Sequence, residues 1–229
     1  MSPVRTRLAA PNKKDNMYQI IEDCSPYYIR YTHDGIQDIF EYANLHTPNL
    51  QGINYGFKHH VFKPDQADAI LSMIPTHKQI PLEKDRVSLF MTSPRLYYRA
   101  HKDGSYDHVS INYTCKILDD KCITSWYSDE DLSIYNIDTL DGQSRECFKF
   151  DKTKHNPVKS MIAKPNEAIL FNSEIYHDWD NSQSDNERVV LTLRPVYAIR
   201  PQIYFETMRN LMFEFKKEKY VTKQSKIHK

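Results

Sequence analysis

Two histidines and one aspartate in this sequence have the spacing of a metal site. His101 and Asp103 are separated by one residue, and His177 lies far along the chain. Residues i and i+2 of a β-strand project from the same face, so His101 and Asp103 can converge on one point. With His177 as the third ligand, two imidazoles and one carboxylate would cover one face of an octahedral metal and leave its other positions open. The three residues therefore predict a catalytic metal centre.

The order of the surrounding segments supports the assignment of these three residues to a metal site. A His-x-Asp pair alone is expected about once by chance in a chain with ten histidines. Here a predicted strand over residues 96–103 leads into His101, and residues 168–172 and 176–179 form predicted strands around His177. Arg188 then follows His177 on a further alternating strand, where it would place a fixed cation near the metal.

Two predicted strands have one polar and one apolar side. Over residues 108–117 the apolar side holds Val109, Ile111, Tyr113, Cys115 and Ile117, and the other side holds His108, Ser110, Asn112 and Thr114. On the last strand, Arg188, Val190, Thr192 and Arg194 share one side. An apolar outer side packed on helices and a polar inner side is what a barrel around a charged ligand requires.

This arrangement of His-x-Asp, distal histidine and arginine resembles the 2-oxoglutarate- and Fe(II)-dependent dioxygenase superfamily over residues 96–195. The resemblance implies a mostly β fold with flanking helices and a double-stranded β-helix (jelly-roll, cupin-like) core. It implies Fe(II) bound by His101, Asp103 and His177, and a 2-oxoglutarate cosubstrate anchored by Arg188. It further implies O2 as a reactant, succinate and CO2 as products, and hydroxylation of a C–H bond as the default reaction.

Further cosubstrate contacts are expected from the same resemblance. Tyr97, predicted to share a face with Arg99, His101 and Asp103, and Asn112 are both candidates. Many relatives carry serine or threonine two residues after the arginine, but this chain has Val190 there. Thr192 or Tyr97 would substitute, and Arg194 is the second candidate for the anchor. Asp178 or Asp180 is an alternative third ligand.

Two other classes of protein fit the same residues. One is a cupin-like barrel that binds a metal or a small acid without turnover, and the other is a metal oxygenase that does not use 2-oxoglutarate. The position of Arg188 after His177 favours the 2-oxoglutarate enzyme over both. The substrate is expected to be a small metabolite, a free amino acid or a peptide side chain.

Composition bounds the remaining possibilities. The chain has 229 residues, which suits one domain over residues 1–229, and sixteen tyrosines with ten phenylalanines favour a β-rich protein. The formal charge is +1, so nucleic acid is not an expected partner. We see no secretory signal and no apolar run long enough to cross a bilayer, so we expect a cytoplasmic protein without membrane contact. Oligomeric state is not indicated.

Within this domain we expect a flexible tail over residues 1–15, helices over residues 35–45 and from residue 64, a jelly-roll core over residues 86–195 and a C-terminal helix over residues 200–220. Asp34 is the expected cap of the first helix. The polar segment 129–144 is expected to form an excursion over the barrel mouth that could act as a lid. Trp126 or Tyr127 could form a wall of the substrate pocket. The four cysteines are expected to be reduced thiols, although Cys115 and Cys122 could face each other across a hairpin.

Overall fold

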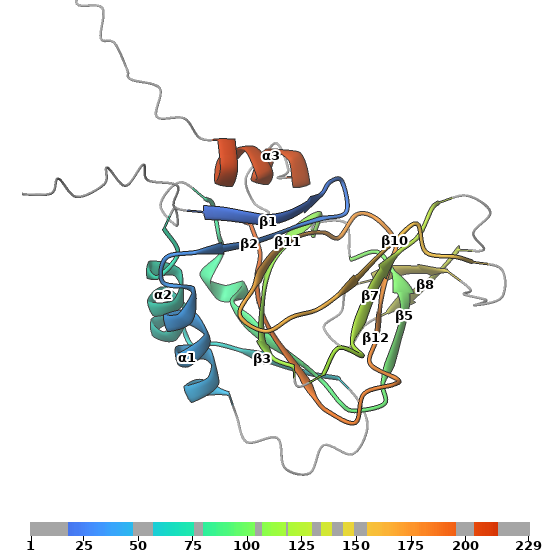
Figure 1. Cartoon of the computed structure of the whole chain (residues 1–229), viewed down its shortest axis with the longest axis horizontal. Coiled ribbons are helices and arrows are strands. Elements are labelled where there is room, and N and C mark those ends of the chain that lie inside the picture. Colours follow the sequence, from blue (N-terminus) through green and yellow to red (C-terminus); the bar gives the residue numbers. More distant parts are fainter. Residues whose placement is uncertain are drawn as a thin grey trace, which may run out of the picture.

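The computed structural model describes residues 18–47, 57–75, 80–103, 107–117, 119–129, 134–138, 144–148, 155–195 and 204–214. Two antiparallel β-sheets make up most of these residues, and helices lie outside the larger sheet (Figure 1). No helix within these ranges combines the length and hydropathy that a membrane crossing requires.

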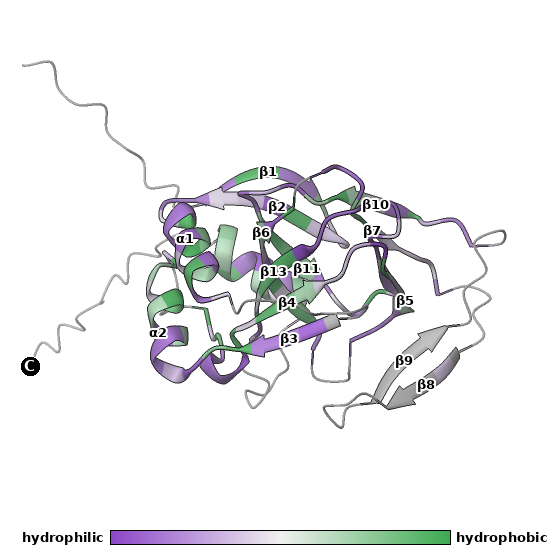
Figure 2. Ribbon diagram, turned by 90° about the horizontal axis from the view of Figure 1, so that it is seen from below, coloured by the Kyte–Doolittle hydropathy of each residue, from purple (hydrophilic) through white to green (hydrophobic). Residues whose placement is uncertain are grey.

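The larger sheet has seven strands in the order β1-β2-β11-β6-β13-β4-β3. Their bounds are β1 Tyr18–Cys24, β2 Tyr28–His33, β3 Phe57–Val61, β4 Ser88–Thr92, β6 Val109–Lys116, β11 Ala168–Asn172 and β13 Arg188–Leu193. Hydrophobic residues mark β4 and β6 in the interior of this sheet, whereas β3 at its edge is hydrophilic (Figure 2).

The smaller sheet has six strands in the order β10-β7-β12-β5-β9-β8. Their bounds are β5 Tyr97–His101, β7 Ile123–Trp126, β8 Ile134–Asp138, β9 Ser144–Phe148, β10 Lys159–Ile162 and β12 His177–Asp180.

Eight of these strands form the predicted double-stranded β-helix. From β4 to β7, successive strands alternate between the larger and the smaller sheet. From β10 to β13 they alternate again. This is the strand order of a jelly roll, in which two sheets enclose a common interior. The predicted fold class, mostly β with flanking helices around a jelly-roll core, is confirmed.

The helices cover the outer face of the larger sheet. Their bounds are α1 Ile36–His46, α2 Pro64–Ser72 and α3 Phe205–Arg209, followed by a π-helical turn at Asn210–Glu214; a short 3₁₀ turn, Lys84–Arg86, precedes β4. Buried side chains of α1, α2 and α3 pack against the apolar sides of β6 and β13, including Ile111, Tyr113 and Leu191. The main hydrophobic core therefore lies outside the barrel, and the inner face of the larger sheet remains available for polar groups.

The structure corrects several local expectations. Gly35, with φ of 83°, occupies the cap position of α1 instead of Asp34. The expected excursion over residues 129–144 is partly regular, because residues 134–138 form β8, which pairs with β9 at the edge of the smaller sheet. The first strand, β1, has no counterpart among the predicted elements. The tail over residues 1–15 and both ends of the predicted C-terminal helix, residues 200–203 and 215–220, lie outside the described residues.

Cys24, Cys115 and Cys122 are free thiols, so no bond joins Cys115 to Cys122. The side chain of Cys147 is not among those described. Burial raises the pKa of Cys115 to about 12, which makes this thiol unreactive near neutral pH.

Candidate metal and cosubstrate site

His101 and His177 lie opposite each other on neighbouring strands. They are register partners on β5 and β12, and their ring centroids are 4.6 Å apart. Both side chains are buried, each with 1% of its surface exposed. The strand pairing thus brings together two histidines that are far apart in the sequence.

The backbone fixes the tautomer of both imidazoles. His101 Nδ1 lies 2.9 Å from the carbonyl oxygen of Arg99, and His177 Nδ1 lies 2.9 Å from that of Ile175. A carbonyl oxygen can only accept, so each Nδ1 carries the proton and donates it. In its neutral form each ring then presents the lone pair of Nε2, the arrangement that metal-binding histidines usually have.

Asp103 completes the predicted triad just beyond β5. Its Oδ1 lies 3.5 Å from His101 Nε2, and one ligand atom from each of the three residues can be chosen so that all lie within 4.8 Å of one another. His101 Nε2 is buried and has no hydrogen-bond partner in the described part of the chain. A buried, unsatisfied lone pair facing a carboxylate fits a metal ion, which would satisfy it.

Arg194 keeps the carboxylate ionised. Its Nη2 lies 3.3 Å from Asp103 Oδ2, and its Nη1 pairs with Asp107, which also binds Arg86 Nη2 at 2.5 Å. Burial alone would raise the pKa of Asp103, but the charge of Arg194 outweighs it and holds the pKa well below its usual range. Asp103 is therefore a charged ligand at neutral pH.

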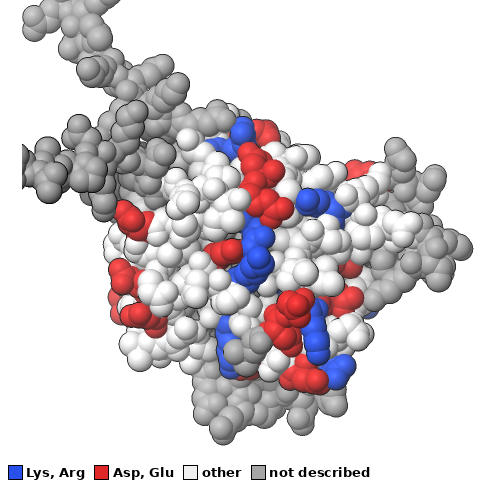
Figure 3. All heavy atoms as spheres, in the orientation of Figure 1, with Lys and Arg blue, Asp and Glu red and all other residues white. Residues whose placement is uncertain are grey.

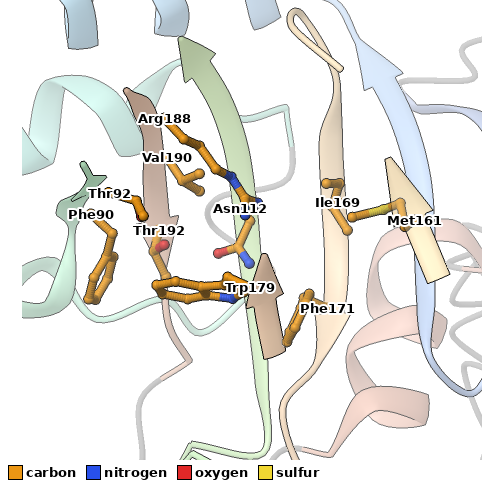
Figure 4. A pocket seen from close by; sticks show the side chains of 10 residues that line it. All are labelled: Phe90, Thr92, Asn112, Met161, Ile169, Phe171, Trp179, Arg188, Val190 and Thr192. Atoms are coloured by element: carbon orange, nitrogen blue, oxygen red, sulfur yellow. The ribbon is translucent and has the colours of Figure 1, made fainter. Parts of the chain in front are cut away.

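Two adjoining pockets, together called the cavity, lie beside this triad. One is lined by Asp103, His177 and Arg194, and the other, shown in Figure 4, by Arg188 and Val190. The two parts share five lining residues, which are Phe90, Asn112, Phe171, Trp179 and Thr192. The predicted common face of β13 is confirmed, because Arg188, Val190, Thr192 and Arg194 all line this cavity.

Arg188 is a buried cation with no counter-charge in the described residues. Only 6% of its surface is exposed, and Nε and Nη1 have no hydrogen-bond partner there. Its guanidinium carbon lies 5.9 Å from the Trp179 ring centroid, and the side chain reaches from β13 towards Asn112 on β6 (Figure 4). The two unpaired guanidinium nitrogens give this end of the cavity the chemistry of an anion site.

Tyr97 lies elsewhere, and its expected common face with His101 is wrong. His101 pairs with His177, and Tyr98 pairs with Trp179. Two residues lie between Tyr98 and His101 but only one between His177 and Trp179, so β5 contains a bulge. The bulge places Tyr98 beside His101, with ring centroids 4.8 Å apart. The Tyr97 hydroxyl instead donates to Asp178 Oδ2 at 3.2 Å. Tyr97 is not among the residues that line the described cavity.

Other candidates lie outside the ligand set. Asp178 points to the opposite face of β12, where it accepts hydrogen bonds from the Tyr127 hydroxyl at 2.7 Å and from the Ser125 amide at 3.1 Å. Asp180 accepts a bond from the amide of Ser182. Trp126 is fully buried in a packed cluster, and neither it nor Tyr127 lines the cavity.

The aromatic walls of the cavity were missed in the sequence. Phe90, on β4, and Trp179, on β12, both line it, and their ring centroids are 6.4 Å apart. The available signal was the i, i+2 rule, since Trp179 follows His177 by two residues and so shares its face.

Comparisons with known proteins give only weak similarities. No protein-family model matches the chain, and no curated protein sequence matches it. The epimerase SnoN, solved with Fe3+, alpha ketoglutarate and nogalamycin RO, aligns with a TM-score of 0.46 at 8% identity, over 75% of this chain and 82% of SnoN. A Pseudomonas putida prolyl-4-hydroxylase aligns with a TM-score of 0.41 at 15% identity, over 74% of this chain and 93% of its own. HygX from Streptomyces hygroscopicus, solved with nickel and 2-oxoglutarate, aligns with a TM-score of 0.44 at 7% identity, over 74% of this chain and 83% of HygX. With TM-scores below 0.5, these similarities assign no function to this chain.

Proposed function

We propose that this protein is an Fe(II)- and 2-oxoglutarate-dependent oxygenase. The observation that carries the proposal is the pairing of two sites in one cavity. At one end, His101, Asp103 and His177 present ligand atoms within 4.8 Å of one another. At the other end, Arg188 is a buried cation without a described counter-charge. A dicarboxylate that carries a 2-oxo acid at one end suits both.

The donor set fits Fe(II) with exchangeable positions. His101, Asp103 and His177 would hold the ion, and iron when bound supplies the O2 chemistry that side chains lack. Arg194 keeps Asp103 ionised, and the two carbonyl-bound Nδ1 protons fix the orientation of the histidines.

The cosubstrate would lie between the ion and Arg188. The guanidinium would receive the distal carboxylate as a charge-assisted pair, which is strong when it is bidentate and shielded from water. Phe90, Phe171 and Trp179 line the cavity along this path and would exclude water from it. Asn112 and Thr192, which line both parts of the cavity, would supply further polar contacts.

We propose oxidation of a C–H bond, by default hydroxylation, with release of succinate and CO2. The substrate would be a small metabolite, an amino acid or a peptide side chain. On the face seen in Figure 3, the acidic and basic groups of the described residues are interspersed and form no broad basic field. This distribution supports a substrate other than nucleic acid.

Succinate formation tests the proposal. The purified protein, supplied with Fe(II), ascorbate, 2-oxoglutarate and O2, should form succinate slowly even without its substrate, and His177→Ala should not. Binding of metal and 2-oxoglutarate without succinate would instead support a non-catalytic cupin-like barrel. Oxidation of a substrate without any need for 2-oxoglutarate would support a different metal oxygenase.

A further inference from the structure

Four charged side chains form a row that leads from the metal site towards the protein surface. Asp103 Oδ2 lies 3.3 Å from Arg194 Nη2, and Arg194 Nη1 pairs with Asp107 Oδ2. Asp107 Oδ1 then lies 2.5 Å from Arg86 Nη2. Asp107 and Arg194 are buried, whereas 19% of the Arg86 side chain is exposed. Carboxylates and guanidiniums thus alternate along the row, and Arg194 and Asp107 each divide their two arms between two neighbours.

The main chain fixes the positions from which these side chains start. The Ser173 carbonyl oxygen accepts a hydrogen bond from the Asp103 amide at 3.2 Å, and the Ser173 hydroxyl donates to the Asp107 carbonyl oxygen at 2.6 Å. The Arg194 carbonyl oxygen accepts a bond from the Glu83 amide at 3.0 Å. What can change is therefore how the side-chain arms are shared, since the backbone at each position is held in place.

The pairing between Arg194 and Asp107 depends on their charges. Within the described residues, Arg194 Nη1 and Asp107 Oδ1 lie in ion pairs but make no hydrogen bond of acceptable geometry. If Asp107 lost its charge, little would hold Nη1 in place, and the nearest remaining carboxylate that contacts Arg194 is Asp103.

Asp103 has one oxygen for the metal and one for Arg194. Its Oδ1 lies 3.5 Å from His101 Nε2 and so faces the position of the ion, whereas Oδ2 faces Arg194. A guanidinium can pair with both oxygens of one carboxylate in a fork-like arrangement. If Arg194 closed on Asp103 in this way, it would compete with the metal for Oδ1.

We propose that Asp107 is a positioning residue of the metal site, which holds one arm of Arg194 and so leaves Asp103 Oδ1 to the metal. Arg194 then keeps Asp103 ionised without occupying it. This inference rests on the proposed function, because it takes His101, Asp103 and His177 to bind a divalent metal.

The row predicts effects of opposite sign at neighbouring positions. Asp107→Asn keeps the shape and removes the charge, so the affinity for Mn(II), measured by calorimetric titration of the full chain, should fall about 10- to 100-fold. Asp107→Glu keeps the charge and should retain most of the affinity. Arg86→Met leaves Asp107 to Arg194 alone, which draws Arg194 away from Asp103. Mn(II) affinity should then rise about 2- to 5-fold, whereas a merely structural role would give no increase.

Glu167→Gln is the matched control. Glu167 and Glu22 share the Arg30 guanidinium in the same way, with Nε 2.8 Å from Glu167 Oε2 and Nη1 3.1 Å from Glu22 Oε2. Glu167 precedes β11, whose five residues span about 17 Å and whose other end lies near Asp103. Glu167→Gln should lower the urea midpoint of unfolding, as Asp107→Asn also should, but leave Mn(II) affinity unchanged.

The outcomes separate this inference from the proposed function. If the wild type binds Mn(II) and 2-oxoglutarate and Asp107→Asn binds Mn(II) equally well, the role of Asp107 is refuted and the proposed function stands. If Asp107→Asn and Arg86→Met both weaken Mn(II) binding, the loss comes from disturbed packing and the inference is also refuted. Should Asp107→Asn not fold, Arg86→Met decides, because a tighter Mn(II) complex supports the inference and any other result refutes it. If the wild type does not bind Mn(II), both fail together.

Discussion

Replacing Arg188 by methionine should stabilise the ligand-free protein and abolish tight 2-oxoglutarate binding. Arg188 is 6% exposed, its guanidinium carbon lies 5.9 Å from the Trp179 ring centroid, and two of its nitrogens are unpaired among the described groups. Burying unsatisfied polar groups costs about 1–3 kcal/mol by mutational measures. Methionine fills similar space without that cost, so the free energy of unfolding should rise by roughly this amount.

The cost to binding follows from the same geometry. Loss of a buried, charge-assisted bidentate pair costs about 2–5 kcal/mol. The dissociation constant of 2-oxoglutarate should therefore rise roughly thirtyfold to several thousandfold. Arg188→Lys should recover only part of the affinity, because an ammonium lacks the planar fork of the guanidinium.

Arg194→Met is the matched contrast on the same strand face. Arg194 pairs with Asp103 and Asp107, so its removal leaves buried carboxylates short of a partner. That change should destabilise the fold by about 3–5 kcal/mol and weaken metal binding. Chemical denaturation of the metal-free variants and calorimetric titration with 2-oxoglutarate measure both effects. The reasoning is refuted if Arg188→Met destabilises the protein and leaves 2-oxoglutarate affinity unchanged.

Three further perturbations have defined outcomes. Alanine at His101, Asp103 or His177 should abolish tight metal binding while the circular dichroism spectrum stays native. A variant that keeps the wild-type metal content would show that the replaced residue is not a ligand. Burial lowers the pKa of His33, whose Nε2 lies 3.0 Å from the Tyr113 hydroxyl. The folded state thus favours neutral His33, its contribution to stability is lost as pH falls below about 6.5, and His33→Gln should reduce this pH dependence in urea denaturation. Tyr127→Phe should cost about 1–2 kcal/mol of unfolding free energy, because it removes a buried donor to Asp178, whereas an unchanged denaturation midpoint would show that this bond contributes nothing.

Alternation along single strands could be predicted from the sequence. Asn112 and Ser110 face the cavity and Ile111 and Tyr113 face the helices, as the pattern of β6 indicates. The predicted metal triad meets for a similar reason, since His101 and Asp103 follow from local spacing. The position of His177 opposite His101 also required the strand order, which came from a family resemblance.

Features that depend on pairing between strands could not be predicted. The bulge in β5 moves Tyr97 off the face of His101. A single sequence does not indicate that β5 has an extra residue opposite the pair His177 and Trp179. Polarity suggested a loop over residues 129–144, but residues 134–138, with the sequence Ile-Tyr-Asn-Ile-Asp, form an edge strand that pairs with β9.

The central claim is that one cavity binds Fe(II) and 2-oxoglutarate together. Anaerobic titration of 2-oxoglutarate into the Fe(II)-loaded protein, followed by visible absorption, tests it most directly, since chelation by a 2-oxo acid produces a metal-to-ligand charge-transfer band. The account predicts a saturable band that requires both components, disappears in Asp103→Ala and shifts to much higher 2-oxoglutarate concentrations in Arg188→Met. An Fe(II)-loaded wild type that shows no band at any 2-oxoglutarate concentration would contradict it.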